Sequence, residues 1–326
     1  MNGELHVVFG TGPAGVAVAE ELLRRGATVR TVNRSGRPAL AAVDTVGGDA
    51  TDPAFTVAAA AGATAVYFCL NAPHYDRWAE EFPPLQRAVL AAATAAGARL
   101  VVLENLYLYG RPQSPFDEGT PVRPTSSKAR VRARMSEELL AAHHRGDVRV
   151  VLGRASDFVG PGVTDSALGE FVFRPALAGR RAQTMGRPDT LHTYSYVPDV
   201  GRNLVLLGTH DEAYGRAWHL PNPPTRTTRH VVTDVYAAAT GARRTGLLAL
   251  KRPMIRLLGL FNRNVRQLLQ TYDQFADPWV VDDRAFVRAF GGHVTDWPEV
   301  VSTTMAWYRA DPELQRHPEP AVDSTV

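Results

Sequence analysis

Three glycines near the N-terminus have the spacing of a phosphate-binding loop. Gly10, Gly12 and Gly15 form a G-x-G-x-x-G pattern between an apolar run and an alanine-rich helical stretch. In this order, the first glycine allows a tight turn, the second lets the backbone approach a pyrophosphate, and the third lets helix and strand pack closely. Pro13 and Ala14 fall in the first helical turn, whose N–H groups would face the phosphates. The pattern predicts dinucleotide binding; packing alone is the alternative.

The end of the second apolar run bears on which dinucleotide is bound. NAD-binding proteins usually place a carboxylate there, on the ribose 2′-hydroxyl. Here the run ends at Asn33 and Arg34, with Arg37 close behind. A guanidinium suits a bidentate grip on the 2′-phosphate of NADP, so we expect NADP, with NAD less favoured; a solvated loop arginine is the other interpretation. After a third apolar run, Asp49 or Asp52 either approaches the adenine end or caps the next helix.

The elements that must position these residues alternate along the first half of the chain. Apolar runs predict strands near 4–9, 28–33, 43–47, 65–70, 100–104 and 148–154. Helical patterns lie near 14–25, 53–61, 75–96 and 126–145, and later near 226–240, 250–272 and 298–308. This alternation predicts an α/β fold, a Rossmann-like doubly wound parallel sheet with a smaller C-terminal substrate-binding part.

The domain limits follow from where the alternation stops. We expect residues 1–160 to form the dinucleotide-binding domain, to which later strands return, and 161–310 to form mainly a substrate-binding lid. Residues 311–326 are polar and contain prolines, which predicts a flexible tail.

The composition is that of an ordinary globular chain. Its 326 residues are 45% hydrophobic and 21% charged, and the formal net charge of +3 is too small to indicate nucleic-acid binding. No apolar run reaches membrane-spanning length and no signal peptide is evident, so we expect a cytoplasmic protein without a membrane partner. The one cysteine, Cys69, excludes an intrachain disulfide, and no cluster has metal-ligand spacing.

Several short motifs follow one another in a recognisable order. They are Tyr109-Gly110, Glu118 to Pro121, Lys128, Arg154 to Pro161, His192 to Val200 and Trp218 to Asn222. Over about residues 5–310 the chain resembles the extended short-chain dehydrogenase/reductase family of the NAD-dependent epimerase/dehydratase type. The resemblance implies a nicotinamide-dependent enzyme, and a homodimer formed by the helices near 75–96 and 126–145.

The catalytic residues of that family are only partly present. The lysine of its Tyr-x-x-x-Lys pattern matches Lys128, but the tyrosine position holds Pro124, and the family's Ser/Thr aligns with Asn105. The resemblance implies that Lys128 binds the nicotinamide ribose; a solvated helix residue is the alternative. For proton transfer we expect Tyr107, because a lysine and a cationic nicotinamide nearby would depress the pKa of its phenol; simple packing is the alternative. Asn105 would polarise a carbonyl oxygen, and we expect it, Tyr107 and Tyr109 on one side of an extended segment.

The remaining candidates concern the cofactor and a helix face. The resemblance places Asn71 near the ribose and Asp157 near the carboxamide of the cofactor. Arg130, Arg132 and Arg134 are predicted to lie on a solvated helix face. We therefore expect an NADP-dependent oxidoreductase or epimerase-like enzyme for a small carbonyl, hydroxyl or activated-alkene substrate, with a non-standard acid/base set. A non-redox lyase, isomerase or cyclase and a non-catalytic dinucleotide sensor are the alternatives.

Overall fold

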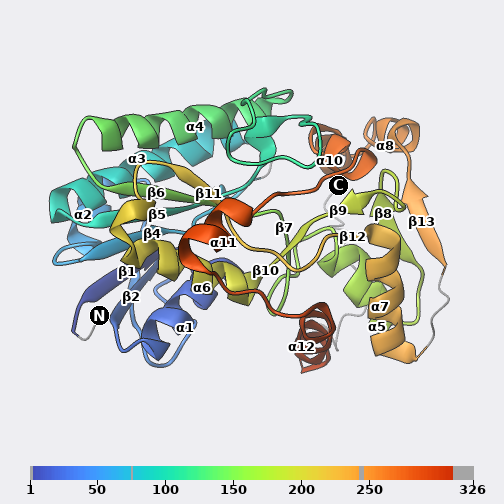
Figure 1. The fold of residues 1–326 in the computed structure, drawn as a ribbon, viewed down its shortest axis with the longest axis horizontal. Helices are drawn as coiled ribbons and strands as arrows, with labels where there is room; N and C mark the ends of the chain where they lie inside the picture. The colour runs from blue at the N-terminus through green and yellow to red at the C-terminus, as the bar shows by residue number, and fades with distance from the viewer. Residues whose placement is uncertain (1–2, 75, 242–245, 311–326) are drawn as a thin grey trace. The chain divides into compact units, whose positions relative to one another are not determined.

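The computed structural model describes residues 3–74, 76–241 and 246–310 (Figure 1). It divides into two compact units. Unit 1 comprises Met1–Ala155, Pro198–Pro221 and Asp282–His293, and unit 2 comprises Ser156–Val197, Asn222–Val281 and Val294–Val326. The first part of unit 1 ends five residues before the predicted limit at 160, and two later segments return to it. The predicted tail, 311–326, lies outside the described residues.

A seven-stranded parallel sheet forms the centre of unit 1. Its strands are β1 (Leu5–Phe9), β2 (Thr28–Asn33), β3 (Asp44–Gly47), β4 (Ala65–Phe68), β5 (Arg99–Glu104), β6 (Val150–Arg154) and β11 (Ala217–His219). They are arranged in the order β11-β6-β5-β4-β1-β2-β3, and every neighbouring pair is parallel. The sequence-based prediction of a Rossmann-like doubly wound sheet is confirmed.

Helices cover both faces of this sheet. Figure 1 shows α2 (Pro53–Ala59), α3 (Trp78–Ala96) and α4 (Ser127–His144) on one face, and α1 (Pro13–Arg24) and α6 (Val197–Thr209) on the other. Four of them match the predicted helices closely, but α6 was not predicted. Its buried residues Val200, Leu204 and Leu207 have the spacing of one helix face. Gly201 lets α6 approach α1, because a Cβ there would lie 2.5 Å from the backbone carbon of Ala17.

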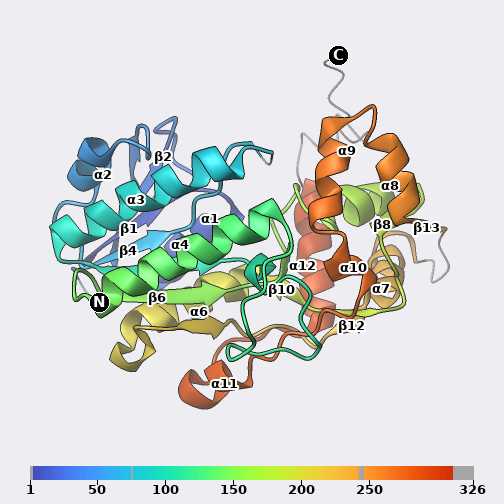
Figure 2. The same cartoon turned by 90° about the horizontal axis from the view of Figure 1, so that it is seen from above.

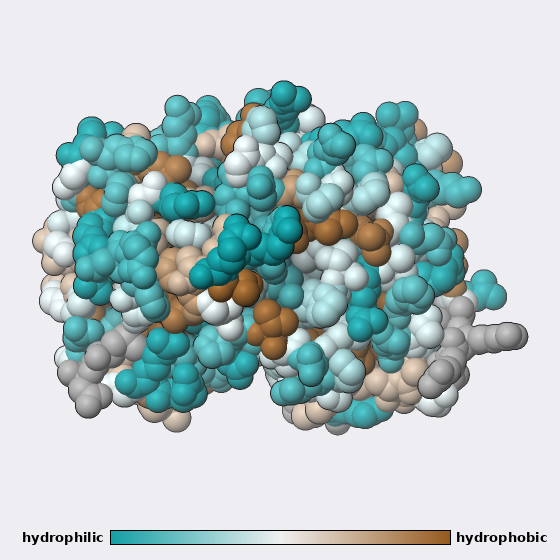
Figure 3. All heavy atoms as spheres, viewed as in Figure 1, coloured by the Kyte–Doolittle hydropathy of each residue, from teal (hydrophilic) through white to brown (hydrophobic). Residues whose placement is uncertain are grey.

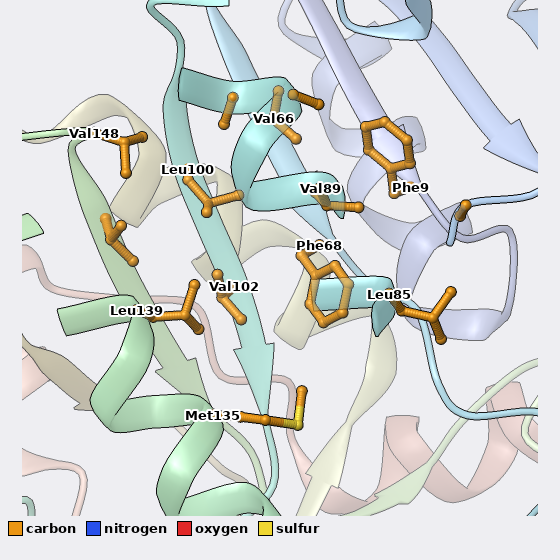
Figure 4. Close-up of a cluster of buried hydrophobic side chains, with 14 of the residues drawn as sticks. Phe9, Val66, Phe68, Leu85, Val89, Leu100, Val102, Met135, Leu139 and Val148 are labelled. Atoms are coloured by element: carbon orange, nitrogen blue, oxygen red, sulfur yellow. The ribbon is translucent and has the colours of Figure 1, made fainter. Parts of the chain in front are cut away.

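The core between the sheet and helices α2, α3 and α4 explains why these strands appear in the sequence as continuous apolar runs. Strand residues such as Phe9, Phe68 and Val102 pack against Leu85 of α3 and Leu139 of α4 (Figure 4). Strands covered on both faces have no solvent side that would call for alternating polar residues. Full burial of each such side chain contributes about 1.5–3 kcal/mol to folding.

Unit 2 has its own core, with short strand pairs and helices. The strand pairs are β7 (Asp157–Val159) with β10 (Tyr194–Tyr196), β8 (Ala182–Met185) with β13 (Leu247–Leu250), and β9 (Leu191–His192) with β12 (Arg226–Thr227). The main helices α7 (Thr228–Thr240) and α12 (Trp297–Ala310) confirm two predictions, and η2 (Gly169–Phe173) and α5 (Arg174–Leu177) pack with α7. None of the helices in the described ranges is long and apolar enough to cross a membrane.

The predicted helix over 250–272 is wrong as a single element. The segment forms α8 (Arg252–Leu258), α9 (Arg263–Gln267) and the 3₁₀ turn η4 (Leu268–Gln270), followed by α10 (Asp273–Ala276). The break lies at Gly259, where α8 ends and the chain turns back (Figure 2). A Cβ at Gly259 would lie 3.0 Å from the Cα of Arg266, so glycine permits the close approach of α8 and α9.

Candidate dinucleotide and catalytic site

A different structural feature explains why each position of the loop holds glycine. Gly10 has φ +105°, and a Cβ there would lie 2.7 Å from the carbonyl oxygen of Cys69. A Cβ at Gly15 would lie 1.9 Å from the carbonyl oxygen of Gly10, so only glycine fits between helix and loop. At Gly12, by contrast, no described atom lies within 4 Å of that position. The space beside Gly12 is therefore open to a ligand, as pyrophosphate approach requires.

The start of α1 fits a phosphate group. The helix begins at Pro13, and among the described residues no side chain caps it. Its first-turn N–H groups and the positive end of its dipole are therefore available to an anion. Burial raises the pKa of the neighbouring Cys69 thiol to about 12, so this thiol stays protonated and is not a reactive nucleophile.

We expect the second and third glycines of the loop to separate binding from folding. Gly12→Ala should leave the free energy of unfolding unchanged or raise it by about 0.4–1 kcal/mol, because its φ of −71° suits alanine. The same change should weaken dinucleotide binding by about tenfold or more, since the added methyl occupies the approach path. Gly15→Ala should instead cost about 1–3 kcal/mol of stability through overpacking.

Urea unfolding and fluorescence titration with NADPH measure the two effects. Normal NADPH affinity in Gly12→Ala would show that the ligand does not approach the backbone there.

Asn33 lies at the end of β2, where it shapes the following loop. Its Nδ2 donates to Thr11 Oγ1 at 3.1 Å and to the Arg37 carbonyl at 2.9 Å. Its Oδ1 accepts from the backbone N–H groups of Ser35 and Gly36 at 3.1 and 2.8 Å. Asn33 therefore ties the glycine loop to residues 35–37, and both of its amide hydrogens are used within the chain. Its predicted contact with the cofactor stays a prediction.

Two arginines follow Asn33 with exposed side chains. In the part of the chain that the structure describes, the guanidinium groups of Arg34 and Arg37 make no hydrogen bond or ion pair. The nearest carboxylate on the neighbouring strand, Asp44, pairs with Arg30 at 2.7 Å. The end of β2 thus presents positive charge and no acidic residue.

The two aspartates after β3 differ in their roles. Asp52 caps α2 by accepting from the Ala54 N–H at 2.9 Å. Asp49 Oδ1 accepts from the N–H and hydroxyl of Thr51, and the backbone bond is the main cause that lowers the pKa of Asp49. Asp52 is therefore the helix cap, and exposed Asp49 remains the candidate for the adenine end. Asn71 is also exposed, just past the end of β4, and accepts from the N–H of Ala72 at 3.0 Å.

Beyond β5 the chain does not stay extended, so the prediction that Asn105, Tyr107 and Tyr109 share one side is wrong. Residues Tyr107–Tyr109 form the 3₁₀ turn η1, in which side chains two apart diverge. Tyr109 is buried, whereas Tyr107 is half-buried and stacks on Trp78 of α3, with ring centroids 5.9 Å apart. Asn105 Oδ1 accepts from the Tyr107 N–H at 3.2 Å, while its Nδ2 has no hydrogen-bond partner among the described residues.

Lys128 approaches the same tryptophan from α4. Its Nζ lies 5.9 Å from the Trp78 ring centroid, and the residue is only 3% exposed, so the solvated alternative is wrong. Burial lowers the pKa of Lys128 to about 8, against the opposing effect of Asp76. Tyr107 from η1 and Lys128 from α4 therefore both approach Trp78.

Pro124, at the position where the resemblance would place a tyrosine, lies in a segment that is not helical. Helix α4 begins only at Ser127, with the Ser126 hydroxyl accepting from the Ala129 N–H, so Pro124 lies outside the helix. The segment before it runs close to Gly110, where a Cβ would lie 2.0 Å from the Arg123 carbonyl oxygen. Position 124 thus lacks the helical turn that would carry a side chain one turn before Lys128.

A buried polar network behind the site was missed by sequence reasoning. Glu104 Oε2 accepts from Arg154 Nε at 3.1 Å and from the Ser136 hydroxyl at 3.2 Å. Arg154 also donates to the Tyr109 hydroxyl at 2.7 Å. All four residues are less than a tenth exposed. The charge of Arg154 is therefore satisfied inside unit 1 rather than on a ligand.

The network continues from Tyr109 to His219, and its proton positions follow from the partners. His219 Nδ1 faces the Asp282 carbonyl at 3.1 Å, so it carries the hydrogen, and Nε2 accepts from the Tyr109 hydroxyl at 2.9 Å. Burial and the charge of Arg154 lower the pKa of His219 to about 4, which keeps it neutral. The Glu118 carboxylate accepts from the His219 N–H at 2.8 Å.

Arg132 corrects the prediction of a solvated arginine face on α4. Arg130 and Arg134 are exposed, but Arg132 is 1% exposed and lies 3.7 Å from Glu104. Residues two apart point to opposite sides of a helix, whereas residues four apart share a side. The four-residue spacing between Lys128 and Arg132 is the sequence signal that could have predicted this buried face.

Asp157 belongs to unit 2, on β7. Its Oδ2 lies 2.8 Å from Nε2 of buried His192, whose Nδ1 faces the Gln274 carbonyl at 3.1 Å. Its predicted contact with the cofactor carboxamide stays a prediction. In the described ranges, no group of three or more His, Cys, Asp or Glu side chains is arranged to hold a metal ion.

A parallel sheet of this order with a glycine loop after β1 defines the class of Rossmann-like α/β proteins. Residues 7–220 match the model of the NAD dependent epimerase/dehydratase family. The chain belongs to this family of enzymes, as its motif order predicted.

Solved structures show the same fold over nearly the whole chain. An epimerase from Methanothermobacter thermautotrophicus is 18% identical with a TM-score of 0.79, covering 97% of this chain and 95% of its own. The Bordetella bronchiseptica enzyme WbmH, solved with NAD+, is 19% identical with a TM-score of 0.73, covering 94% and 99%. A dTDP-glucose 4,6-dehydratase double mutant from Streptomyces venezuelae, solved with NAD, is 18% identical with a TM-score of 0.77, covering 95% and 98%. A search of curated proteins found no match.

Proposed function

We propose that the chain is an NADP-dependent oxidoreductase or epimerase-like enzyme that acts on a small carbonyl, hydroxyl or activated-alkene substrate. The observation that carries this proposal is that Tyr107 and buried Lys128 both approach Trp78, in the same unit as an intact glycine loop. A phenol and an ammonium group of lowered pKa form an acid/base pair of the kind that carbonyl reduction requires.

In this proposal the residues of the chain divide the work. A bound nicotinamide supplies or accepts the hydride. The Tyr107 hydroxyl donates a proton to the substrate oxygen during reduction and takes it back during oxidation. Asn105 polarises a carbonyl oxygen of the substrate through Nδ2, since its Oδ1 already accepts from the Tyr107 N–H. The Lys128 ammonium stabilises the phenolate that Tyr107 becomes, and holds the ribose.

The choice of NADP rests on the residues after β2. Structural neighbours were solved with NAD. In this chain, however, Arg34 and Arg37 offer two exposed guanidinium groups where a ribose-binding carboxylate would stand. Charge-assisted bonds to a 2′-phosphate contribute about 1.5–3 kcal/mol each. The homodimer and the cytoplasmic location stay predictions.

We expect Arg34→Ala combined with Arg37→Ala to weaken NADPH binding by about 10- to 100-fold and to leave NADH binding within about twofold. Isothermal titration of both cofactors measures the ratio. Arg87→Ala, an exposed arginine on α3, is the matched control and should change neither affinity. Tighter binding of NADH than NADPH by the unaltered protein would contradict the assignment.

The enzyme itself is tested by following NADPH absorbance with a panel of ketones, aldehydes, enones and sugar nucleotides. Sugar nucleotides are included because one structural neighbour is a dTDP-glucose dehydratase. Oxidation of NADPH by at least one class is the expected result. Tight cofactor binding without turnover would favour a sensor, and product formation without net NADPH oxidation would favour lyase or isomerase chemistry.

A further inference from the structure

Exposed apolar side chains gather on one short segment of unit 2. Most apolar residues on the face drawn in Figure 3 form small groups among hydrophilic ones. Of the eleven large hydrophobic side chains exposed in the described part of the chain, five lie within residues 254–261. They are Met254, Leu257 and Leu258 on α8, and Leu260 and Phe261 in the turn that follows. Such concentration indicates an interaction surface, whereas scattered exposed residues do not.

Backbone hydrogen bonds fix the turn, and its apolar side chains point outward from it. Leu260 and Phe261 are 75% and 87% exposed, so they protrude rather than line a groove. Their N–H groups nonetheless donate to the carbonyls of Leu257 and Leu258 at 3.2 and 3.1 Å. On the inner side of α8, Ile255 is fully buried and anchors the helix. Figure 2 shows α8 and α9 side by side, joined by this turn at one end.

The charged residues within the segment 251–267 are all basic. Residues 251–267 contain five Lys or Arg residues and no Asp or Glu. Arg252 pairs with Asp273, but Lys251, Arg256 and Arg266 are exposed and make no side-chain bond to another described residue. An apolar tip beside unpaired cations has the composition of a segment that lies at a membrane interface.

We propose that the α8–α9 turn is a contact surface for an anionic phospholipid bilayer. Leu260 and Phe261 would insert at the boundary between headgroups and acyl chains, while Lys251, Arg256 and Arg266 bind lipid phosphates. A protruding tip fits a fluid surface better than it fits a protein groove, and the excess of cations selects anionic lipid. The expectation of no membrane partner rests on the absence of a membrane-spanning segment from the sequence. An interfacial contact does not need such a segment.

Vesicle co-sedimentation of the full-length protein tests this surface. We expect binding to vesicles of equal parts phosphatidylcholine and phosphatidylglycerol that is at least about tenfold tighter than to phosphatidylcholine alone, and that weakens with salt. Leu260→Ser with Phe261→Ser should reduce the binding by about tenfold or more, as should Arg256→Gln with Arg266→Gln. Val122→Ser, at an exposed apolar residue of unit 1, is the matched control and should bind normally.

Circular dichroism and melting curves show whether each variant folds. Absence of the unaltered protein from the vesicle pellet would overturn the proposal, as would equal binding to both vesicle types. If the serine variants bind vesicles normally but change from dimer to monomer in size-exclusion chromatography, the surface instead joins two copies of the chain. That result also overturns the proposal.

Discussion

Replacing Tyr107 by phenylalanine is expected to lower turnover by about 10²- to 10⁴-fold, the range for loss of a general acid or base. Affinity for NADPH should stay within about twofold, because the ring still stacks on Trp78 and the glycine loop is unchanged. Steady-state kinetics on the best substrate of the panel, together with NADPH titration, measures both quantities.

Tyr109→Phe is the matched control for this change. Tyr109 is buried and bonded to Arg154 and His219, so losing its hydroxyl should cost about 1–3 kcal/mol of stability without removing the reacting group. The two tyrosines should therefore separate activity from stability. Normal turnover in Tyr107→Phe would remove Tyr107 from the mechanism.

The pH profile tests the partner of Tyr107. The pKa of Lys128, lowered by burial to about 8, leaves its ammonium mostly charged at neutral pH. The rate of carbonyl reduction should fall as the pH rises through about 8, because the charge that stabilises the phenolate is lost. Lys128→Arg should move this fall to higher pH, since a guanidinium stays protonated. A profile that is the same in both proteins would show that another group titrates.

Replacing Glu104 by glutamine is expected to lower the free energy of unfolding by about 3–5 kcal/mol. Glu104 is 2% exposed and is the carboxylate that faces two buried arginines, Arg154 at 3.1 Å and Arg132 at 3.7 Å. The amide would leave both positive charges buried without compensation. Burial already lowers the pKa of Arg132, which shows how poorly the site tolerates unbalanced charge.

Urea unfolding of four variants measures this effect: Glu104→Gln, Glu137→Gln, Arg154→Met, and Glu104→Gln combined with Arg154→Met. Glu137→Gln makes the same chemical change on the exposed side of α4 and should stay within about 0.5 kcal/mol of the unaltered protein. Arg154→Met added to Glu104→Gln should cost less than the sum of the single changes, because the residues act on each other. A loss below about 1 kcal/mol in Glu104→Gln would show that the network does not stabilise unit 1.

Much of unit 1 could be predicted because its signals are local. The strands and the glycine loop could be predicted, because apolar runs and glycine spacing are patterns that extend over only a few residues of the chain. The helix over 250–272 was not, because its break at Gly259 depends on how closely α9 approaches α8. Helix α6 was missed although its apolar spacing is present in the sequence, because only its first residues, up to Val200, belong to one of the motifs.

The sequence by itself determined the Rossmann-like sheet, the glycine spacing of the loop after β1 and the absence of an acidic residue at the end of β2. Only the tertiary structure decided that Tyr107 turns toward Trp78 while Tyr109 turns inward, and that Arg132 is buried against Glu104. The physical reason is the distance along the chain over which each signal acts. Periodicity and glycine chemistry act between near neighbours, whereas the surroundings of a side chain depend on partners brought together by the fold, as His219 meets Tyr109 across 110 residues of sequence.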